Sequence, residues 1–464
     1  MTARRPTLVY GIAITGEAIA RALVSRGHDV VLADDAVNPR AQALATELGV
    51  DLVEAPDAPT IRSLVASVDA VLPAPGVPET HAVVTEAMAH DVPVRTELDV
   101  AYEWEQHRPG GPRPMIGITG TDGKTTTTLM VAALLEAGGL RAAAVGNTEV
   151  PLVAALDDPV DAFAVECSSF RLAFAHSFRT EAAIWLNLAP DHQNWHRTMG
   201  SYEAAKARIW QLQRPDDVAI GWVGDPAVLA QLDRAPGRHV TFGLDGADYR
   251  AVRHDDGTTT LHGPAGELAH ATSLQRAFPH DITNALAAAA ACVEARLVAP
   301  DRVDAGLAAF RLPPHRIEPL GTVHGIEWFN DSKATSPHAA LTAIRSFQSI
   351  VLIAGGRNKG LDLSSLAGEA DRIRAVVAIG ESAADIEAAF AGTRPVEVAT
   401  SMAQAVAAAE RLARPGDVVL LSPACASFDW YPEGGYPARG DDFRGLVEQL
   451  QHADRSACRM GGAA

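Results

Sequence analysis

Short apolar runs alternate with longer amphipathic stretches along the first part of the chain. Residues 8–10 and 30–32 predict strands, residues 16–25 predict a helix between them, and residues 70–72 predict a third strand. Strands that alternate with helices are typical of βαβ units, in which the strands form a parallel sheet. The first block of the chain therefore predicts a Rossmann-like fold.

The same alternation returns twice more along the chain. Six further apolar runs predict strands of two more sheets: 115–118, 162–166, 183–188, 350–354, 375–379 and 418–421. A stretch rich in Pro, Gly and Arg at 108–114 and two prolines at 313–314 predict the boundaries between blocks. With 464 residues the chain is too long for a single core. It is predicted to be an α/β protein with three domains, at 1–111, 112–313 and 314–464.

One segment carries the strongest chemical signal. The apolar run at 115–118 is followed by glycine-rich turns with the spacing Gly117-x-x-Gly120-x-x-Gly123-Lys124-Thr125, and a helical pattern follows. Glycines let several backbone N–H groups point into one concavity, the helix N-terminus adds positive charge, and a Thr hydroxyl can ligate Mg²⁺. The alternative is a tight turn with a surface lysine. The coincidence of glycines, Lys and Thr favours a phosphate-binding loop for a nucleotide.

Polar residues follow two further strands of this second block. Glu166 ends the run at 162–166, and His192 comes shortly after the run at 183–188. The carboxyl ends of parallel strands lie beside the ligand crevice, where a carboxylate can hold Mg²⁺. Glu166 could instead cap a helix, and His192 could be a packed or surface histidine. The composition of the segment around Lys206, taken alone, is typical of a helix with a solvated lysine.

The other two blocks carry weaker signals. The turn from Gly11 to Gly16 resembles a dinucleotide-binding turn, but Ala13 replaces its middle glycine, so a structural turn and a nucleotide-sugar site remain open. In the third block, loops that follow apolar runs contain Lys333, Lys359 and Ser427. Loops at one sheet edge often bind ligands, so these residues predict an anion-binding wall.

Composition excludes several classes of function. The net charge of −18 argues against nucleic acid or an anionic membrane as a partner. The four cysteines (Cys167, Cys292, Cys425 and Cys458) lack metal-ligand spacing, which favours reduced thiols. The sequence starts without a secretory apolar segment, and its apolar runs are too short to span a bilayer. A cytoplasmic protein is expected.

Taken together, these motifs resemble those of the Mur ligase family over essentially the whole chain. The carrying segments are 120–125 (Gly-Thr-Asp-Gly-Lys-Thr), 146–147, 166–172 (Glu-Cys-Ser-Ser-Phe-Arg-Leu), 191–192, 202–208, 315–316, 330–335 (Asn-Asp-Ser-Lys-Ala-Thr) and 422–427 (Ser-Pro-Ala-Cys-Ala-Ser). The last segment, followed by Arg439-Gly440-Asp441, resembles the branch of the family that adds glutamate. The resemblance implies a uridine-nucleotide domain, a central ATP domain and an amino-acid domain.

The resemblance also implies a role for each candidate residue. For ATP it implies Gly120, Thr121, Asp122, Gly123, Lys124, Thr125, Thr126, Asn284, Arg316 and Asp331. For Mg²⁺ it implies Thr125, Glu166, His192 and Lys206, the last as an N-carboxylated lysine. Catalysis would rest on Lys124, Glu166, His192 and Lys206. For the two other substrates it implies Thr15, Gly16, Asp34, Asn147, Ser168, His192, Lys333, Thr335, Lys359, Ser427 and Tyr436.

The activity implied by the resemblance is ATP-dependent addition of D-glutamate to UDP-N-acetylmuramoyl-L-alanine through an acyl phosphate, by a monomeric enzyme of peptidoglycan precursor synthesis. The alternatives are the same ligation with L-glutamate, another amide ligase of the Mur or folylpolyglutamate type, and a non-catalytic nucleotide-binding protein. The last is motivated by Asp122 and Asp281, each in place of the family's usual Asn. Two further departures are Gln193-Asn194 in place of Leu-Asp and Ser336 in place of Asn.

Overall fold

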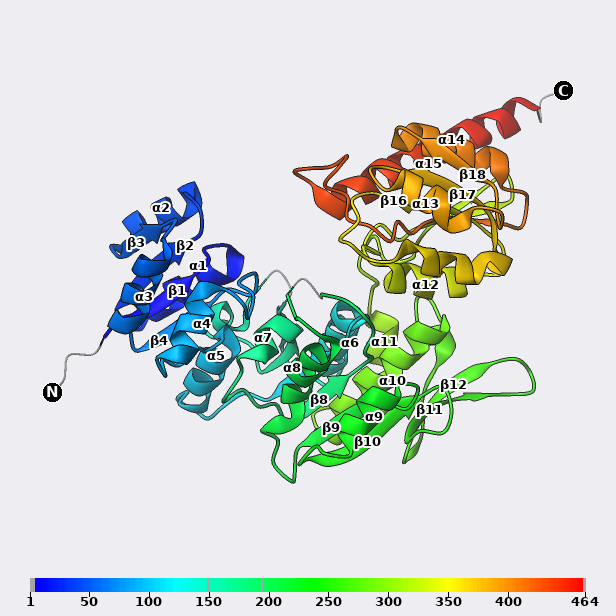
Figure 1. The fold of residues 1–464 in the computed structure, drawn as a ribbon. Coiled ribbons are helices and arrows are strands. Elements are labelled where there is room, and N and C mark those ends of the chain that lie inside the picture. Colours follow the sequence, from blue (N-terminus) through cyan, green and yellow to red (C-terminus); the bar gives the residue numbers. More distant parts are fainter. Residues whose placement is uncertain (1–4, 148–149, 193–194, 462–464) are drawn as a thin grey trace. The chain divides into compact units, whose positions relative to one another are not determined.

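The computed structural model describes residues 5–147, 150–192 and 195–461. They form an α/β fold with three sheets, as predicted (Figure 1). Two compact units divide the chain, Met1–Phe310 and Arg311–Ala464. The first unit contains two of the sheets, so the predicted division between residues 111 and 112 remains a prediction. Within the described ranges, no helix combines the length and apolar character that a membrane span requires.

The first sheet has four parallel strands in the order β3-β2-β1-β4. Its strands are β1 (Thr7–Tyr10), β2 (Val30–Asp34), β3 (Asp51–Glu54) and β4 (Ala70–Pro73). Helices α1 (Ile14–Ser25), α2 (Pro39–Leu48), α3 (Ala58–Ser67) and α4 (Ala82–Ala89) surround these strands (Figure 1). Helix α5 (Glu97–Gln106) follows and begins with a Thr96–Asp99 capping box. The predicted helix at 16–25 begins two residues earlier, at Ile14, so that Thr15 and Gly16 lie in its first turn.

The second sheet has nine strands in the order β13-β12-β11-β10-β9-β8-β5-β7-β6. Its strands are β5 (Met115–Thr119), β6 (Ala142–Gly146), β7 (Ala162–Glu166), β8 (Ala182–Trp185), β9 (Val218–Trp222), β10 (Arg238–Gly243), β11 (Tyr249–Arg253), β12 (Thr259–Gly263) and β13 (Gly266–His270). Strands β5 and β7 are buried along their whole length, because helices cover the sheet there. The antiparallel pairs β11–β12 and β12–β13 extend the sheet beyond the predicted strands.

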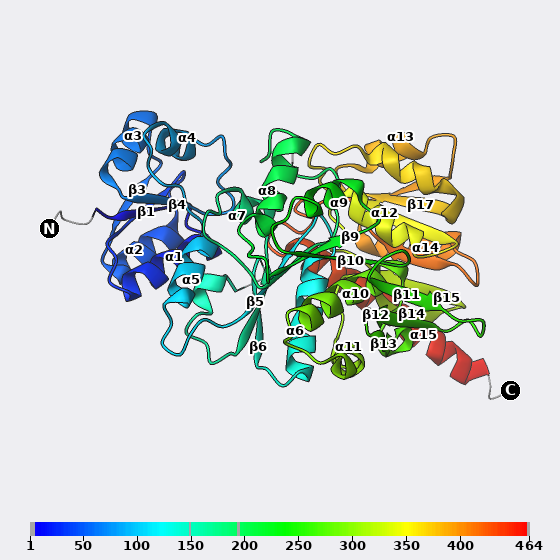
Figure 2. The same cartoon turned by 90° about the horizontal axis from the view of Figure 1, so that it is seen from below.

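The helices of this sheet lie on its two sides (Figure 2). They are α6 (Lys124–Ala137), α7 (Ser169–Ala173), α8 (Met199–Gln211), α9 (Pro226–Leu232), α10 (Pro279–Glu294) and α11 (Val303–Ala309). Helices α6, α10 and α11 cover one side, and α6 packs against both of the others. Helix α8 packs on β5 and β8, where the Trp210 indole donates to the carbonyl of Ala183 at 2.9 Å. These contacts fix the start of α6 and one face of α8 beside the carboxyl end of β5.

The second unit is built on six strands in the order β14-β15-β19-β16-β17-β18, of which only the β14–β15 pair is antiparallel. The strands are β14 (Glu318–Val323), β15 (Ile326–Asn330), β16 (Ile350–Gly355), β17 (Ile373–Ile379), β18 (Val396–Ala399) and β19 (Val418–Leu421). The helices are α12 (Pro337–Arg345), a 3₁₀ segment at Leu363–Arg372, α13 (Ala383–Phe390), α14 (Met402–Leu412) and α15 (Gly435–Gly461). A core of aliphatic side chains with Trp328 and Phe443 holds this sheet to its helices.

Candidate active site

The predicted phosphate loop joins β5 to α6. Gly120 and Gly123 have φ angles of 154° and 83°, and Gly123 is the N-cap residue of α6 with no side chain capping the first turn. A Cβ at Gly123 would lie 2.9 Å from Asn284 Oδ1, and one at Gly120 would lie 2.9 Å from Leu186 Cβ. Both positions therefore require glycine. The uncapped N–H groups of α6, beside Lys124, Thr125 and Thr126, are suited to an anion.

Asn187, which follows β8, holds this loop in shape. Its Oδ1 accepts hydrogen bonds from the N–H groups of Thr121 and Asp122, both at 2.9 Å, and its Nδ2 donates to the carbonyl of Asp122 at 3.2 Å. The Thr121 hydroxyl is buried and accepts from the N–H of Ala189 at 2.9 Å. Asn187 was not among the predicted site residues, although its place at the carboxyl edge of the sheet was a usable signal.

Two lysines meet at one carbonyl of the loop. Lys124 Nζ donates to the carbonyls of Gly120 (3.0 Å) and Thr121 (2.7 Å), and Lys206 Nζ, from α8, also donates to Gly120 at 2.5 Å. Lys206 is only 1% exposed and lies over the Tyr202 ring at 4.5 Å, so the prediction of a solvated lysine from composition alone is wrong. Burial first, and the neighbouring Lys124 ammonium second, lower the pKa of Lys206 well below its ordinary value. A lysine in this setting is readily deprotonated to a nucleophilic amine.

Glu166 ends β7 at the same sheet edge. Its side chain is 2% exposed, and Oε1 accepts from Asn147 Nδ2 at 3.1 Å. Its Oε2 is buried and has no hydrogen-bond partner among the described residues. A buried carboxylate oxygen without a donor is costly, which favours a cation as its missing partner. In the described part of the chain, no three His, Cys, Asp or Glu side chains form a metal cluster.

Two histidines, His192 and His196, lie on the segment between β8 and α8. His192 has a left-handed backbone (φ 54°), a side chain 36% exposed, and its Nε2 lies 3.4 Å from Asp191 Oδ2. Non-glycine residues in this conformation are strained and common at functional sites. Its ring contacts Phe170 edge-on, with centroids 4.7 Å apart. Gln193 and Asn194 lie outside the described residues.

His196 was missed by the sequence analysis. It is fully buried, its Nε2 lies 2.9 Å from Ser169 Oγ, and its Nδ1 has no partner in the described ranges. Burial lowers the pKa of His196 to about 4, with smaller contributions from His192 and Lys206, so the ring is neutral at pH 7. The usable signal was its position four residues after His192. Ser168, a predicted substrate residue, caps α7 by accepting from the N–H of Arg171 at 3.3 Å.

Three of the predicted nucleotide-substrate residues, Thr15, Gly16 and Asp34, lie at the carboxyl edge of the first sheet. Asp34 Oδ2 accepts from the N–H of Ile12 at 2.8 Å and from Asn38 Nδ2 at 3.1 Å, which shapes the turn before α1. A Cβ at Gly16 would lie 2.0 Å from the carbonyl oxygen of Gly11, so this turn requires glycine there. Thr15 is nearly buried and accepts from Arg171 Nη2 at 2.9 Å. The turn therefore reaches α7 through Arg171.

Asp281 and Asn284 lie on the first turns of α10. Asp281 is 1% exposed and pairs with Arg276 through two hydrogen bonds of 2.7 and 2.6 Å. It also accepts from the N–H of Phe278 at 3.1 Å. The carboxylate that replaces the usual asparagine thus has a cation of its own, and Asn284 still reaches Gly123.

In the second unit, four of the predicted residues form two pairs. Lys333 Nζ lies over the Tyr436 ring at 3.8 Å from its centroid, and Lys359 Nζ donates to Thr335 Oγ1 at 3.4 Å. Ser427 Oγ is buried without a partner among the described residues. Asp331 is occupied on both oxygens, by the N–H of Ile317 at 3.1 Å and the hydroxyl of Ser422 at 2.7 Å. Ser336, a departure from the family pattern, caps α12.

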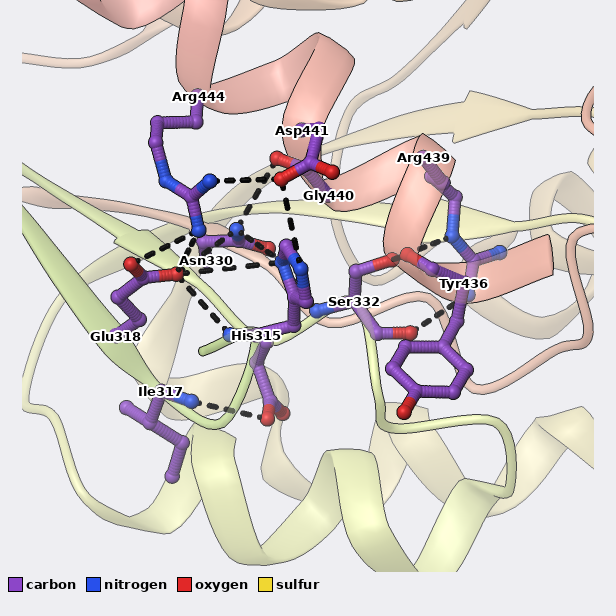
Figure 3. A network of polar contacts seen from close by, with 11 residues as sticks. His315, Ile317, Glu318, Asn330, Ser332, Tyr436, Arg439, Gly440, Asp441 and Arg444 are labelled. Carbon is purple, nitrogen blue, oxygen red and sulfur yellow. Dashed lines mark hydrogen bonds and ion pairs between the residues drawn. The ribbon is translucent and has the colours of Figure 1, made fainter. Parts of the chain in front are cut away.

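The second unit also contains a polar network around His315 and Asn330 (Figure 3). Asn330 Nδ2 lies 2.9 Å from His315 Nδ1 and donates to Glu318 Oε2 and the carbonyl of Gly440, while Arg444 donates to Glu318. Arg439 is buried, donates to the hydroxyl and carbonyl of Ser332 and the carbonyl of Cys425, and has a pKa lowered by burial to about 10. Arg439 belongs to the Arg439-Gly440-Asp441 segment of the family resemblance, but it was not predicted to be a site residue. Arg316 and Asp331 belong to this unit and Asn284 to the first, so their joint nucleotide contact remains a prediction.

Comparisons with known families agree with these features. Residues 118–292 match the Mur ligase middle domain, and residues 315–425 match the Mur ligase glutamate ligase domain. A relative from Frankia casuarinae, named UDP-N-acetylmuramoylalanine–D-glutamate ligase, is 42% identical over 460 residues, covering 95% of this chain and 93% of the relative. One of the same name from Pelotomaculum thermopropionicum is 36% identical, covering 97% and 98%.

Solved structures share the fold at low identity. A MurF ligase from Thermotoga maritima in complex with ADP has a TM-score of 0.61 at 16% identity and covers 91% of this chain and 95% of its own. A pseudomurein peptide ligase type C from Methanothermus fervidus has a TM-score of 0.58 at 17% identity, covering 96% and 100%. With the sequence relatives at 36–42% identity over nearly the whole length, the chain belongs to the Mur ligase family.

Proposed function

We propose that this chain is an ATP-dependent ligase that joins D-glutamate to the alanyl carboxyl group of UDP-N-acetylmuramoyl-L-alanine, a step of peptidoglycan precursor synthesis. The observation that carries the proposal is the free Oε2 of Glu166, buried at the sheet edge that also presents the phosphate loop. The names of the nearly full-length relatives support the choice of substrates. ATP and UDP-linked sugars are cytoplasmic metabolites, so the proposal places the reaction in the cytoplasm, with the enzyme acting as a monomer.

Mg²⁺ fits the residues present. Thr125 and Glu166 offer hard oxygen donors, His192 is placed by its strained backbone at the same edge, and the missing partner of Glu166 Oε2 is what a cation would supply. When bound, Mg²⁺ would neutralise charge on the phosphoryl oxygens of ATP. Lys124 would hold the β- and γ-phosphates from the other side, with the N–H groups at the start of α6.

Lys206 would contribute as a carbamate. A lowered pKa raises the fraction of neutral amine, and a neutral amine adds to CO₂ with loss of one proton, which gives a carboxylate-like group. The burial that makes an ammonium costly at this position thereby favours the modification, because the new anion would lie beside Lys124 and the metal. Lys206 would then complete the oxygen ligands that a single acidic residue cannot supply.

The reaction would proceed in two displacements. An oxygen of the alanyl carboxylate bonds to the γ-phosphorus of ATP, the bond to the β–γ bridging oxygen breaks, and ADP leaves. The glutamate nitrogen then bonds to the acyl carbon, phosphate leaves with the electrons of the C–O bond, and the nitrogen loses a proton. Thr15, Gly16, Asp34, Asn147, Ser168 and His192 would orient the uridine nucleotide substrate. Lys333, Thr335, Lys359, Ser427 and Tyr436 would hold glutamate through its carboxylates.

A phosphate-release assay tests the proposal. With ATP, Mg²⁺ and UDP-N-acetylmuramoyl-L-alanine, turnover is expected with D-glutamate and not with L-glutamate, other amino acids or a folate acceptor. Turnover with L-glutamate, or only with a folate, would move the chain to another ligase specificity. No turnover with any amino acid would make it a nucleotide-binding protein without catalysis.

A separate experiment tests the carbamate, and the small number of lysines makes its signal easy to assign. The chain contains four lysines, Lys124, Lys206, Lys333 and Lys359, so ¹³C-bicarbonate can label only these amines and the N-terminus. One carbamate signal is expected by NMR, lost in Lys206→Ala and retained in Lys359→Ala. A signal that survives in Lys206→Ala would remove this part of the proposal.

A further inference from the structure

We propose that Arg171 is a positioning residue that sets the hydrogen-bond polarity of two ligand-facing groups, Thr15 and Asn147, and through Asn147 leaves one oxygen of Glu166 free. The inference rests on the proposed function for the identity of the ligands. It assigns to Arg171 a role that the predicted site residues do not include.

The guanidinium of Arg171 joins three separate segments. It lies on α7 and is 4% exposed. Its Nε donates to Glu97 Oε1 on α5 at 3.0 Å, Nη1 donates to Asn147 Oδ1 after β6 at 2.7 Å, and Nη2 donates to Thr15 Oγ1 on α1 at 2.9 Å. One planar, rigid cation thus contacts Thr15, in the first turn of α1, and Asn147, whose amide contacts Glu166.

Its chemistry fixes the orientation of the Asn147 amide. A guanidinium has donors only, so the atom of Asn147 that faces Arg171 must be the amide oxygen. The amide nitrogen then faces Glu166 and donates to Oε1 at 3.1 Å. Oε1 is thereby occupied, and Oε2, buried and without a partner in the described residues, is the oxygen left for a cation. With the amide reversed, Asn147 would present its oxygen to the Glu166 carboxylate, and the two would repel.

The same argument applies to Thr15. A hydroxyl has one proton and two acceptor lone pairs. Because Arg171 occupies the oxygen as a donor, the proton of the hydroxyl is left to donate elsewhere. Thr15 lies in the first turn of α1, a helix of 12 residues, where the helix dipole also favours a negative ligand group. Arg171 therefore prepares Thr15 as a donor toward the anionic part of a nucleotide substrate.

Glu97 offsets the cost of burying the charged Arg171 guanidinium. It is 2% exposed, pairs with Arg171, and accepts from the N–H of Val153 at 3.1 Å. Burial raises the pKa of Glu97 and the Arg171 charge opposes that rise, so each of the two ions depends on the other. The competing explanation is a clamp that only holds α5 and α7 together.

The first unit contains such a clamp, which serves as the matched control. Arg113 is 6% exposed, pairs with Glu105 at 2.7 Å, and donates to the carbonyls of Leu156 and Asp158. It is bonded to none of the predicted ligand residues in these contacts. Arg113→Met is therefore expected to lower the melting temperature without changing metal binding or the KM for the UDP substrate.

The experiment compares Arg171→Met, Arg171→Gln and Arg113→Met. Mn²⁺ binding in the presence of ADP is measured by electron paramagnetic resonance, together with kcat, the KM for UDP-N-acetylmuramoyl-L-alanine and the melting temperature. Arg171→Met is expected to weaken Mn²⁺ binding about 10-fold and to raise that KM about 10-fold or more, as for other residues that orient ligating side chains. Arg171→Gln, whose amide can still donate to Asn147 Oδ1, is expected to recover most of the Mn²⁺ binding but not the KM.

Two outcomes would overturn the inference. In one, Arg171→Met melts lower, like Arg113→Met, but keeps wild-type Mn²⁺ binding and KM, and Arg171 is then a structural clamp. In the other, Arg171→Gln loses as much Mn²⁺ binding as Arg171→Met does. Mn²⁺ binding would then not depend on the orientation of the Asn147 amide. If Arg171→Met does not fold, the comparison of Arg171→Gln with wild type decides the question. Because Mn²⁺ binding is measured without the UDP substrate, a wild-type enzyme that fails to turn over would contradict the proposed function and leave this test standing.

Discussion

Two polar sites, one in each unit, differ in how their buried groups are paired. At the sheet edge of the first unit, Glu166 Oε2 and His196 Nδ1 are buried and lack partners within the described ranges. In the second unit, the amide nitrogen of Asn330 donates to Glu318 and to the carbonyl of Gly440, and it lies 2.9 Å from His315 Nδ1 (Figure 3). Asn330, like Glu166, ends a strand that pairs with a parallel neighbour, so strand topology alone does not explain the difference.

The proposed function accounts for this difference if Glu166 Oε2 binds a ligand while the network around Asn330 maintains the fold. A buried polar atom without a partner costs roughly 1–3 kcal/mol, so a ligand that supplied the partner of Glu166 Oε2 would remove that cost. A saturated network carries no such cost and fixes one local geometry. In the second unit, Ser427 Oγ is a buried hydroxyl without a partner among the described residues, and it is the one predicted to face the amino acid. All four lysines lie at predicted ligand positions, whereas arginines such as Arg113, Arg179 and Arg374 form ion pairs elsewhere.

The largest effect is expected from Glu166→Gln. Removing the free carboxylate oxygen should lower kcat on the order of 10³-fold, because the charge that holds the metal is lost. The melting temperature should stay the same or rise, since a buried negative charge that has no ion-pair partner among the described residues disappears. Phosphate release and thermal unfolding measure the two effects.

Glu181→Gln is the matched control for that change. Glu181 precedes β8 at the opposite edge of the sheet and accepts from the N–H of Met115 at 2.8 Å. Its variant should keep full activity. A Glu166→Gln enzyme with more than a tenth of wild-type kcat, or one that melts several degrees lower, would make Glu166 a structural carboxylate and erase the contrast between the units.

Gly440→Ala tests the network around His315 and Asn330 in the second unit. A Cβ at Gly440 would lie 2.2 Å from His315 Nδ1, so the variant should lose about 1–3 kcal/mol of unfolding free energy through overpacking. Gly445→Ala, in the same helix, adds a Cβ with nothing within 4 Å and should be neutral or stabilising. Denaturant unfolding compares the two. Equal unfolding free energies of the two variants would mean that the network around His315 rearranges at little cost and does not fix the local geometry.

The smallest effect concerns His196 and pH. Its folded pKa of about 4 lies below the ordinary value of 6.5, so the unfolded chain binds the proton more readily between these values. Stability from the neutral ring is complete above about pH 6.5 and is lost as the pH falls toward 4, by at most about 2 kcal/mol at pH 5. His196→Phe should flatten this part of the pH profile of unfolding free energy. His107→Phe, at an exposed position, should leave it unchanged, and a wild-type slope in His196→Phe would assign the acid sensitivity to other groups.

Much of the architecture and part of the site could be predicted from local pattern. The phosphate loop needs glycines at 120 and 123 for reasons that lie within a few residues, and buried strands such as β7 reveal themselves by continuous apolar runs. The antiparallel strands β11–β13 were not predicted, because short strands at the end of a sheet alternate weakly and carry no motif. The departures at Asp281 and Ser336 gained explanations only from their neighbours, Arg276 and the start of α12.

The sequence by itself determined the fold class, the phosphate loop and the family resemblance, since each depends on neighbouring residues or on motif spacing. Only the tertiary structure decided that Lys206 is buried against Gly120, 86 residues away, and that Arg171 reaches Thr15, 156 residues away. It also decided that one oxygen of Glu166 is left without a donor. Burial, pKa and hydrogen-bond polarity depend on which distant segments meet, and no local pattern in the chain encodes that meeting.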